Sequence, residues 1–406
     1  MAERRSVIVT FKPKDERPDK EQDKLEIVEA AIESPVAFVE AGTMPRGAAL
    51  PVDLPEEMIG YDVNEYEAPI VVASLTDAEI ETLKGNDNVA MVEDDGPCWA
   101  LEGWPAGELA VEGQPSPLAE TVPAGVAQVK APLAWDASRA KAIKVAVLDT
   151  GIFGAHPDLA VNYKGGISFV PGETTPVDFN SHGTHCAGTI AAAINGVGVV
   201  GVAPAAYLYA VKVLSRTGSG NWSYLIAGID WCIKNRMKVL SMSLGGPAAP
   251  SALEAMCNAA WSKGLLLVAA AGNSGPAMGT VGFPAKYGSV IAVSAIDSAN
   301  LIAGFSSRGP EVELCAPGVN VLSTLPGGGF GTKSGTSMAC PHVSGVAALA
   351  WGAHRYNNNV TIRRLLAWTA DNLGIPGRDP LYGYGRVDAE QAATDLVGPP
   401  AIPGIP

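Results

Sequence analysis

The sequence lacks the features that would mark a membrane-spanning chain. It begins MAERRSVIVTFKPKDERPDK, where charged residues end the only apolar run after seven residues. We therefore expect neither a signal-peptide core nor a transmembrane span. A protein that works inside the cell and a secreted protein whose signal peptide has been removed could both begin in this way.

Basic residues are scarce in the first third of the chain. Residues 1–118 carry 26 Asp and Glu against 9 Lys and Arg, whereas residues 119–406 carry 16 against 19. This imbalance argues against nucleic acid as a partner and indicates a separate acidic module. With 406 residues, 47% hydrophobic and without low-complexity tracts, the chain is long enough for two globular domains.

Cysteine is also rare, and its six positions show no short paired spacing. A zinc site is therefore not expected. An even count permits disulfides, but the small residues around Cys186 and Cys340 favour buried thiols.

Three polar residues stand in runs of small or apolar residues: Asp149 in LDTG, His182 in HGTHCAG and Ser337 in GTSMACPH. A serine that performs acyl transfer needs a base within hydrogen-bond reach and a carboxylate that orients the base. The order Asp, His, Ser therefore predicts a nucleophilic hydrolase.

The longer motifs around these residues carry a resemblance to a known family. VAVLDTGI, HPDL, HGTHCAGTIAA, VGVAP, YAVKVL, MSLGG, AAAGN, APG and SGTSMACPH occur in that order. Residues 119–395 thus resemble the catalytic domain of subtilisin-like serine proteases, and the Cys186 variant resembles the branch that includes proteinase K and thermitase. The resemblance implies a calcium-dependent endopeptidase of broad specificity, made as a self-inhibited zymogen, that acts as a monomer on polypeptides.

Residues 1–95 read as a small α+β module of the ferredoxin-like kind. SVIVTFK, AFVEAGT, APIVVAS and VAMVEDD are expected strands, residues 19–32 and 77–84 expected helices, and residues 43–66 an insertion. The module resembles the inhibitory propeptide of the family, although an unrelated ferredoxin-like module has the same order. Residues 96–118 read as a linker with a processing site near Leu118, and residues 396–406 as a Pro-rich tail.

From residue 143 the chain alternates apolar strands with helices. We expect strands at 143–150, 207–214, 238–244 and 264–272, and helices at 182–194 and 334–355. This pattern predicts an α/β fold, a parallel sheet covered by helices on both faces. Asp149, Ser243 and Asn273 fall at the carboxyl ends of strands, where such sheets hold their active sites.

The resemblance assigns Ser337 as nucleophile, His182 as base, Asp149 as the carboxylate that orients it, and Asn273 with the Ser337 amide as the oxyanion site. Without the motifs, Ser337 would read as a helix cap, and Asn273 as a turn residue. His185 and His342 are expected to be structural, and Cys186 to pack behind His182.

Substrate and metal positions also follow from the resemblance. Two edge segments should take a peptide as an added strand, Gly282 should form the floor of the primary pocket, and two further residues should line the pocket for the residue three positions upstream. Calcium is the expected cofactor, held in a tight loop, with a weaker second cation site elsewhere. The edge segments are Ser243, Leu244 and Gly245, and Gly218, Ser219 and Gly220; the upstream pocket is Trp222 and Leu225; the calcium loop is Glu120, Asp158, Ala193, Asn195, Val197 and Val199; the second site is Ala285, Tyr287 and Val290.

Two other functions remain open at this point. A protein of the same fold could bind peptides without cleaving them, although all four catalytic positions are filled. A dedicated maturation protease for one partner is the second alternative, since the long linker leaves room for regulation.

Overall fold

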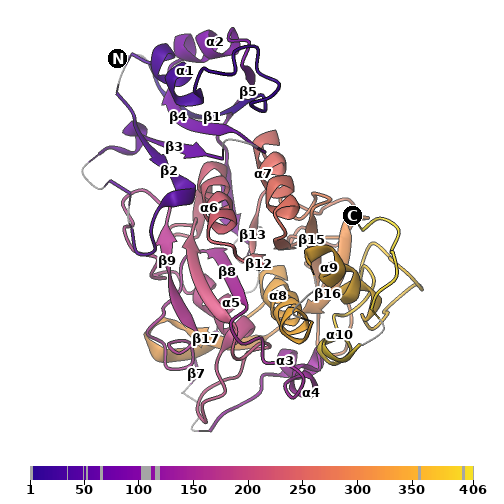
Figure 1. Ribbon diagram of the computed structural model, residues 1–406. Helices are drawn as coiled ribbons and strands as arrows, with labels where there is room; N and C mark the ends of the chain where they lie inside the picture. Colours follow the sequence, from indigo (N-terminus) through magenta and orange to yellow (C-terminus); the bar gives the residue numbers. More distant parts are fainter. Residues whose placement is uncertain are drawn as a thin grey trace.

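The computed structural model describes residues 3–33, 35–48, 50–51, 54–64, 67–101, 111–114, 119–354, 358–395 and 398–405. The chain forms an amino-terminal module, residues 3–95, set against a large domain, residues 119–395 (Figure 1). The predicted linker and the tail fall partly outside the described residues.

The amino-terminal module is a five-stranded sheet with two helices on one side. Its strands lie in the order β2-β3-β4-β1-β5, and β1 pairs antiparallel with both β4 and β5. Helix α2 begins where the sequence predicts, because the Thr76 hydroxyl accepts from the Glu79 N–H and the Glu79 carboxylate accepts from the Thr76 N–H. The elements are β1 (Arg5–Phe11), α1 (Lys24–Ala31), β2 (Ala37–Glu40), η1 (Ala41–Thr43), η2 (Glu56–Met58), β3 (Ile59–Val63), β4 (Ile70–Leu75), α2 (Asp77–Lys84) and β5 (Val89–Asp94).

The prediction that residues 43–66 are an insertion missed one strand of this module. These residues contain β3, which pairs antiparallel with β4. The AFVEAGT strand is shorter than predicted and lies outside β3 as a parallel edge strand, β2. The buried side chains of Ile59, Tyr61 and Val63 explain why β3 takes the inner place.

The large domain is built on a seven-stranded sheet in the order β16-β15-β14-β12-β8-β10-β9, and every pairing in it is parallel. The fold class is thus confirmed, as are the four predicted strands. The strands are β8 (Lys144–Asp149), β9 (Tyr163–Ser168), β10 (Tyr207–Lys212), β12 (Val239–Met242), β14 (Leu266–Ala270), β15 (Val290–Ile296) and β16 (Val312–Pro317).

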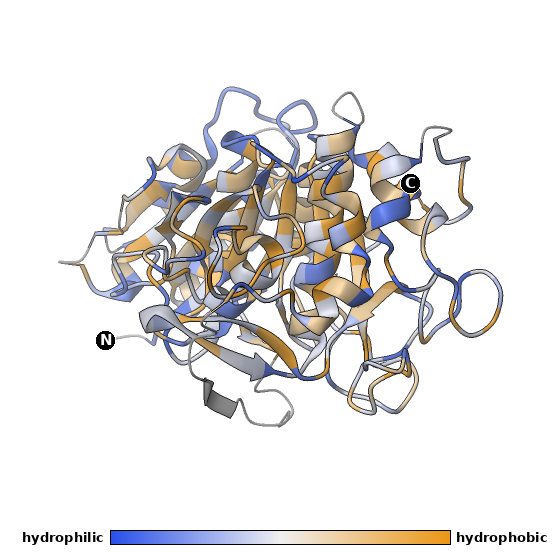
Figure 2. Ribbon diagram, turned by 90° about the horizontal axis from the view of Figure 1, so that it is seen from below, coloured by the Kyte–Doolittle hydropathy of each residue, from blue (hydrophilic) through white to orange (hydrophobic). Residues whose placement is uncertain are grey.

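Helices cover both faces of this sheet, and the ribbon of its interior is largely in the hydrophobic colour of Figure 2. Buried apolar side chains of the sheet and the helices pack in two clusters. Alternate strand residues face opposite sides: Val145 and Val147 pack in one apolar cluster, whereas Ala146 and Leu148 pack in the other. On the first face lie α3 (Ala124–Gln128), α4 (Ala131–Ala134), α5 (His182–Ala191), α8 (Thr336–Ala353), α9 (Asn359–Trp368) and α10 (Ala389–Thr394); on the second lie α6 (Trp222–Lys234) and α7 (Ser251–Ser262).

Two small sheets join the large domain to the segment that precedes it. In the first, β6 (Pro97–Ala100) lies between β11 (Ser219–Asn221) and β13 (Leu244–Gly245). In the second, β18 (Gly329–Lys333) lies between β17 (Val321–Leu325), which the short helix η3 (Pro326–Gly328) follows, and β7 (Val111–Gln114). The stretch predicted as an irregular linker therefore contributes two short strands.

Within the described part of the chain, no helix is both long and apolar enough to cross a membrane.

The module is held against the large domain at the amino ends of α6 and α7. Neither helix has a side-chain cap of its own. The Asp95 carboxylate accepts from the Ser223 N–H and hydroxyl at 3.0 and 2.6 Å, and the Glu93 carboxylate accepts from the Ser251 N–H and hydroxyl at 2.9 and 2.8 Å. Negative charge at a helix amino terminus is stabilising, so the module supplies the caps that both helices lack.

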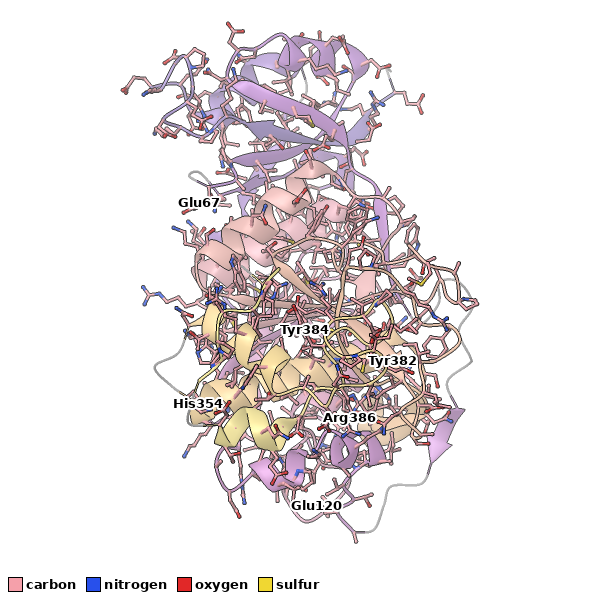
Figure 3. All side chains as sticks on the ribbon, turned by 90° about the vertical axis from the view of Figure 1, so that its right-hand side faces the viewer. Glu67, Glu120, His354, Tyr382, Tyr384 and Arg386 are labelled. Carbon is pink, nitrogen blue, oxygen red and sulfur yellow. The ribbon has the colours of Figure 1, made fainter. Side chains whose placement is uncertain are left out.

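A second contact surface comes from residues 41–64 of the module. The Trp231 indole N–H donates to the Met44 carbonyl at 2.8 Å, and the Tyr61 hydroxyl donates to the Phe169 carbonyl at 2.8 Å. Glu67 lies at the border between the two parts and pairs with Lys263 of the large domain (Figure 3). The inserted residues thus extend the interface along the side of α6.

Candidate active site

Asp149 and His182 meet at the end of β8 and the start of α5. The His182 Nδ1 atom lies 2.8 and 2.9 Å from the two carboxylate oxygens of Asp149, and both side chains are fully buried. The Asp149 carboxylate also accepts from the Thr150 N–H at 2.7 Å. A carboxylate on Nδ1 leaves Nε2 as the ring nitrogen that can exchange a proton with another group.

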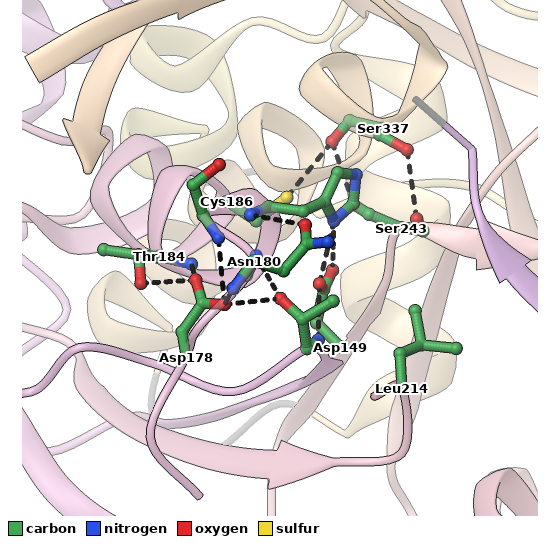
Figure 4. A network of polar contacts seen from close by, with 12 residues as sticks. Asp149, Asp178, Asn180, Thr184, Cys186, Leu214, Ser243 and Ser337 are labelled. Carbon is green, nitrogen blue, oxygen red and sulfur yellow. Dashed lines mark hydrogen bonds and ion pairs between the residues drawn. The ribbon is translucent and has the colours of Figure 1, made fainter. Parts of the chain in front are cut away.

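A buried carboxylate, Asp178, anchors the helix that carries His182 (Figure 4). Its Oδ2 accepts from the Thr184 N–H and hydroxyl at 2.8 and 2.6 Å, and its Oδ1 accepts from the Thr150 hydroxyl and from the N–H groups of Asn180 and Ser181 at 2.8 to 3.0 Å. These bonds satisfy donors at the amino terminus of α5. Sequence reasoning missed Asp178, although an acidic residue four positions before His182 is a signal for a cap.

Close packing between β8 and α5 requires a glycine at position 183. A Cβ atom there would lie 2.2 Å from the Gly151 carbonyl oxygen and 3.1 Å from Asp149 Oδ1. Any other residue would therefore push His182 away from its carboxylate.

Ser337 is the second residue of α8, and its position depends on Pro341. The proline has no N–H, so the Ser337 carbonyl lacks its usual helical donor. The Ser243 hydroxyl donates to that carbonyl at 2.9 Å, and the Cys186 thiol at 3.5 Å. The Ser337 hydroxyl in turn donates to the Ser243 carbonyl at 3.0 Å. Figure 4 shows Ser337 with Ser243 and Cys186 beside it.

Asn273 lies after β14 with its amide orientation fixed. The N–H and the hydroxyl of Thr336 both donate to Asn273 Oδ1 at 2.9 Å. The Nδ2 group must therefore point the other way, and it donates to the carbonyl oxygen of Leu101. Gly335 completes this corner, because its φ of 152° and a Cβ only 3.3 Å from Asn273 Nδ2 would disfavour another residue.

The two predicted edge segments come together around the chain's own strand β6. Ser219 and Gly220 pair antiparallel with Trp99 and Cys98, and Leu244 and Gly245 pair with Ala100 and Trp99. The Ala100 N–H also donates to the Gly218 carbonyl at 2.8 Å. All six predicted edge residues therefore flank an extended segment of this protein.

Leu101 enters the pocket whose floor was predicted at Gly282. The leucine is 3% exposed, and it lines a cavity of about 250 Å³ together with residues of three loops. The cavity wall includes Gly245, Gly246, Ala270, Gly272, Val281, Gly282 and Phe283. A Cβ at Gly282 would approach the Gly246 carbonyl oxygen at 3.0 Å, so a side chain there would narrow this space.

Trp222 and Leu225 lie at the start of α6 and are fully buried. They belong to the same apolar cluster as Cys98, which is three residues upstream of Leu101. The upstream pocket formed by Trp222 and Leu225 stays a prediction.

The residues of the expected calcium loop are also brought together. Thr121 pairs with Val199 and donates its N–H to the Gly198 carbonyl at 2.8 Å, and Glu120 Oε2 accepts from the N–H groups of Asn195 and Gly196 at 2.6 and 2.7 Å. We call this contact of residues 119–121 with loop 193–199 the Glu120 clasp. Glu120 lies at the end of the large domain remote from the amino-terminal module (Figure 3).

Asp158 lies beneath the same loop. Its buried carboxylate accepts from Asn195 Nδ2 at 3.1 Å and from the Val199 N–H at 2.8 Å, and the Asp158 carbonyl accepts from the Ala193 N–H. The side-chain oxygen of Asn195 accepts from the Val197 N–H at 3.0 Å.

The carbonyl of Val290, one residue of the predicted second cation site, lies beside a buried ion pair. The Arg363 guanidinium donates to the carbonyls of Gly288 and Val290, and the Glu313 carboxylate pairs with it at 2.6 Å. The cation site at Ala285, Tyr287 and Val290 stays a prediction.

The remaining histidine and cysteine expectations agree with the structure. Burial lowers the pKa of His185 to about 3 and that of His342 to about 4, and each ring contacts a backbone carbonyl. All six cysteines are buried, and no disulfide joins any two of them. The Cys186 Sγ atom, a carboxylate oxygen of Asp149 and a ring nitrogen of His182 lie within 4.8 Å of one another.

Comparisons with known proteins give the chain its family. A model of the subtilase family matches residues 140–385. Subtilisin E of Bacillus subtilis (strain 168) is 47% identical over 325 residues, which cover 79% of this chain and 80% of that protein. Subtilisin of Bacillus pumilus is 51% identical over 279 residues, covering 68% and 100%, and M-protease of Shouchella clausii (strain KSM-K16) is 43% identical over 332 residues, covering 81% of each. The chain therefore belongs to the subtilase family of serine endopeptidases.

Proposed function

We propose that Ser337, His182, Asp149 and Asn273 carry out the peptide-bond hydrolysis of this endopeptidase. The observation that carries the proposal is the Asp149–His182 pair beside α8, together with an oriented Asn273 amide that meets a peptide carbonyl. All of these groups come from one chain, which supports a monomer as the working unit.

The reaction follows from these positions. The Ser337 hydroxyl leaves its present acceptor, the Ser243 carbonyl, and attacks the substrate carbonyl carbon while His182 takes its proton. Asp149 stabilises the imidazolium that forms. The Asn273 amide and the Ser337 N–H, at the amino terminus of α8, stabilise the negative charge on the carbonyl oxygen. His182 then gives the proton to the leaving amine, and water hydrolyses the ester in the reverse sequence.

The pocket supports a preference for large apolar residues before the scissile bond. Space of about 250 Å³ remains beside Leu101, and small residues, many of them glycines, form most of its wall. Affinity for the rest of the substrate comes from main-chain pairing with β11 and β13, which makes little demand on sequence. Both features favour broad cleavage over action on one partner.

The amino-terminal module serves, we infer, as an inhibitory propeptide. Strand β6 follows the module directly and fills the groove between β11 and β13, so a substrate cannot enter until this segment leaves. The helix caps from Glu93 and Asp95 support tight docking.

Calcium is the proposed cofactor of the loop beneath the Glu120 clasp. The residues fit a hard cation, because they offer carboxylate, amide and carbonyl oxygens, including the buried Asp158 carboxylate. Glu120, Asp158, Asn195 and the carbonyls of Ala193, Val197 and Val199 would hold the ion. Bound calcium would supply stability to the loop and takes no part in the chemical step.

The catalytic proposal is tested by peptidase assays on a small apolar substrate with the wild type, Ser337→Ala and Asp149→Asn. The serine variant should lose activity to background, and the asparagine variant should lose several orders of magnitude in kcat with KM little changed. Wild-type activity in Ser337→Ala would contradict the assignment.

Calcium is tested separately by thermal unfolding of Ser337→Ala with calcium or with chelator. Calcium should raise the Tm, and Asp158→Asn should remove most of this response. An unchanged response in Asp158→Asn would move the site elsewhere.

A further inference from the structure

We propose that this protein first cuts its own chain directly after Leu101, so that the processing bond lies 17 residues before the position expected from the sequence. The inference rests on the proposed catalytic function and names the first substrate of the same site. Four observations lead to it, each on described residues.

The backbone leading to Leu101 is bound as a substrate strand would be. Residues Pro97–Ala100 form a strand between β11 and β13, with the Ala100 N–H on the Gly218 carbonyl. The Leu101 N–H donates to the Ser243 carbonyl at 3.4 Å. A strand held on both sides up to residue 101 presents the next peptide bond to the catalytic groups.

The carbonyl of Leu101 meets the donor that stabilises the oxyanion. Asn273 Nδ2 donates to this oxygen, while the N–H and hydroxyl of Thr336 donate to Asn273 Oδ1. An amide turned by 180° would lose these hydrogen bonds, so its orientation is fixed. An amide donor of this kind stabilises the negative charge that forms on the carbonyl oxygen during attack. Its contact with Leu101 therefore identifies the Leu101 carbonyl as the one that is attacked.

The nucleophile lies beside the same residue. The Ser337 hydroxyl and the Leu101 N–H donate to one common acceptor, the Ser243 carbonyl oxygen. The side chain of Leu101 is buried in the apolar pocket, with space to spare. Backbone, carbonyl and side chain therefore agree on one residue.

The chain after residue 118 is held at a different place. Residues 119–121 form the Glu120 clasp, where the Thr121 N–H bonds to Gly198 and Glu120 bonds to the loop N–H groups. Between the two attachments, residues 111–114 pair with β18 as strand β7. The clasp and the contact of Leu101 with Asn273 thus exist together in the uncut chain.

The proposed step uses only groups of this chain and water. Ser337 Oγ bonds to the Leu101 carbonyl carbon, and the carbon–nitrogen bond to residue 102 breaks. The proton taken by His182 passes to the amino group of residue 102, and water then releases the Leu101 carboxylate and restores Ser337. The products are residues 1–101 and 102–406, and the second keeps residues 102–118 as an amino-terminal extension until a later cut.

The test follows the amino termini and intact masses of the fragments over time in the full chain. The wild type should first give a large fragment that begins at Glu102. Leu101→Asp should slow this cut by about 100-fold, because a carboxylate would lose water in a pocket lined mostly by glycines and apolar residues, and the cation of the pocket, Lys286, already faces Glu311. The matched control Leu118→Asp should leave the first cut unchanged, and Ser337→Ala should remain whole.

Three results would overturn the inference: a first fragment that begins at Ala119, equal slowing in the two aspartate variants, or no cut in the wild type. Thermal unfolding of Leu101→Asp checks its fold, and Leu101→Phe, which keeps an apolar side chain, should be cut at the same bond at a rate within about 10-fold of wild type. Hydrolysis of a small apolar substrate, measured in parallel after trace addition of a second protease, separates the two proposals. Activity that depends on Ser337 upholds the proposed function even if the first cut falls elsewhere.

Discussion

The carboxylate of Glu93 should control how tightly the cut module remains bound to the enzyme. It accepts three hydrogen bonds at the amino terminus of α7, from the Ser251 N–H at 2.9 Å, the Ser251 hydroxyl at 2.8 Å and the Ala252 N–H at 3.2 Å. Helix α7 has no other side-chain cap. Glu93→Gln keeps one acceptor oxygen but removes the charge.

The magnitude follows from these contacts. Loss of a helix cap costs about 0.5–2 kcal/mol, and a charge near the helix terminus contributes about 0.3–1 kcal/mol more at a partly exposed site. Because glutamine keeps part of the cap, we expect a loss of about 1–2 kcal/mol, or roughly 5- to 30-fold weaker binding of the module.

The assay is peptidase activity of the self-cut complex over a dilution series, from which the Kd between module and enzyme is obtained. The matched control is Asp94→Asn, because the neighbouring Asp94 side chain is 69% exposed and contacts Arg5 of its own module. Glu93→Gln should raise the Kd and the control should not. Equal Kd values in the two variants would refute the capping role of Glu93.

Three further predictions concern the large domain. Asp178→Asn should lower the free energy of unfolding by about 3 kcal/mol in urea, because an amide cannot accept all the bonds that this buried carboxylate accepts; a loss under about 1 kcal/mol would contradict this. Gly282→Val should shift the preferred substrate residue from Phe or Leu toward Ala in kcat/KM, since its side chain would enter the cavity beside Leu101; an unchanged preference would mean that the pocket is elsewhere. His185 and His342 have pKa values lowered to about 3 and about 4, so the unfolded state binds more protons below pH 6.5. The free energy of unfolding should therefore fall as the pH falls from about 6.5 toward these values, by about 2 kcal/mol for each histidine at pH 5. Urea unfolding at several pH values compares Ser337→Ala with the double variant Ser337→Ala, His185→Gln. The same dependence of unfolding free energy on pH in both would contradict the prediction.

Much of the catalytic arrangement was predictable because short motifs contain both the reacting group and its local support. Asp149 with Thr150, and Ser337 with Thr336 and Pro341, are neighbours in sequence as well as in space. The apolar strands likewise indicated a parallel sheet, and that sheet brings their carboxyl ends together.

The features that sequence reasoning missed depend on contacts between distant segments. Leu101 looks like one apolar residue in an irregular stretch until its carbonyl meets Asn273, 172 residues later. The hydrogen bond from the Arg363 guanidinium to the Val290 carbonyl, 73 residues away, is a second such contact. Local composition does not encode either partner, since each pairing follows from how whole elements pack.

Strand β3 was missed for a related reason, because it lies in residues 43–66, which were predicted to be an insertion. Its pairing with β4 and the burial of Ile59, Tyr61 and Val63 identify it as a strand. Both depend on segments that are distant in sequence.

The central claim, that Ser337 is the nucleophile, is tested most directly by covalent labelling of the self-cut enzyme with a sulfonyl fluoride. We expect one adduct per active enzyme, located on Ser337 by peptide mass mapping, with activity lost in proportion to labelling. His182→Ala, processed in trans, should label far more slowly because its serine lacks a base. Full inactivation with the adduct on another residue, or full activity with Ser337 modified, would contradict the account.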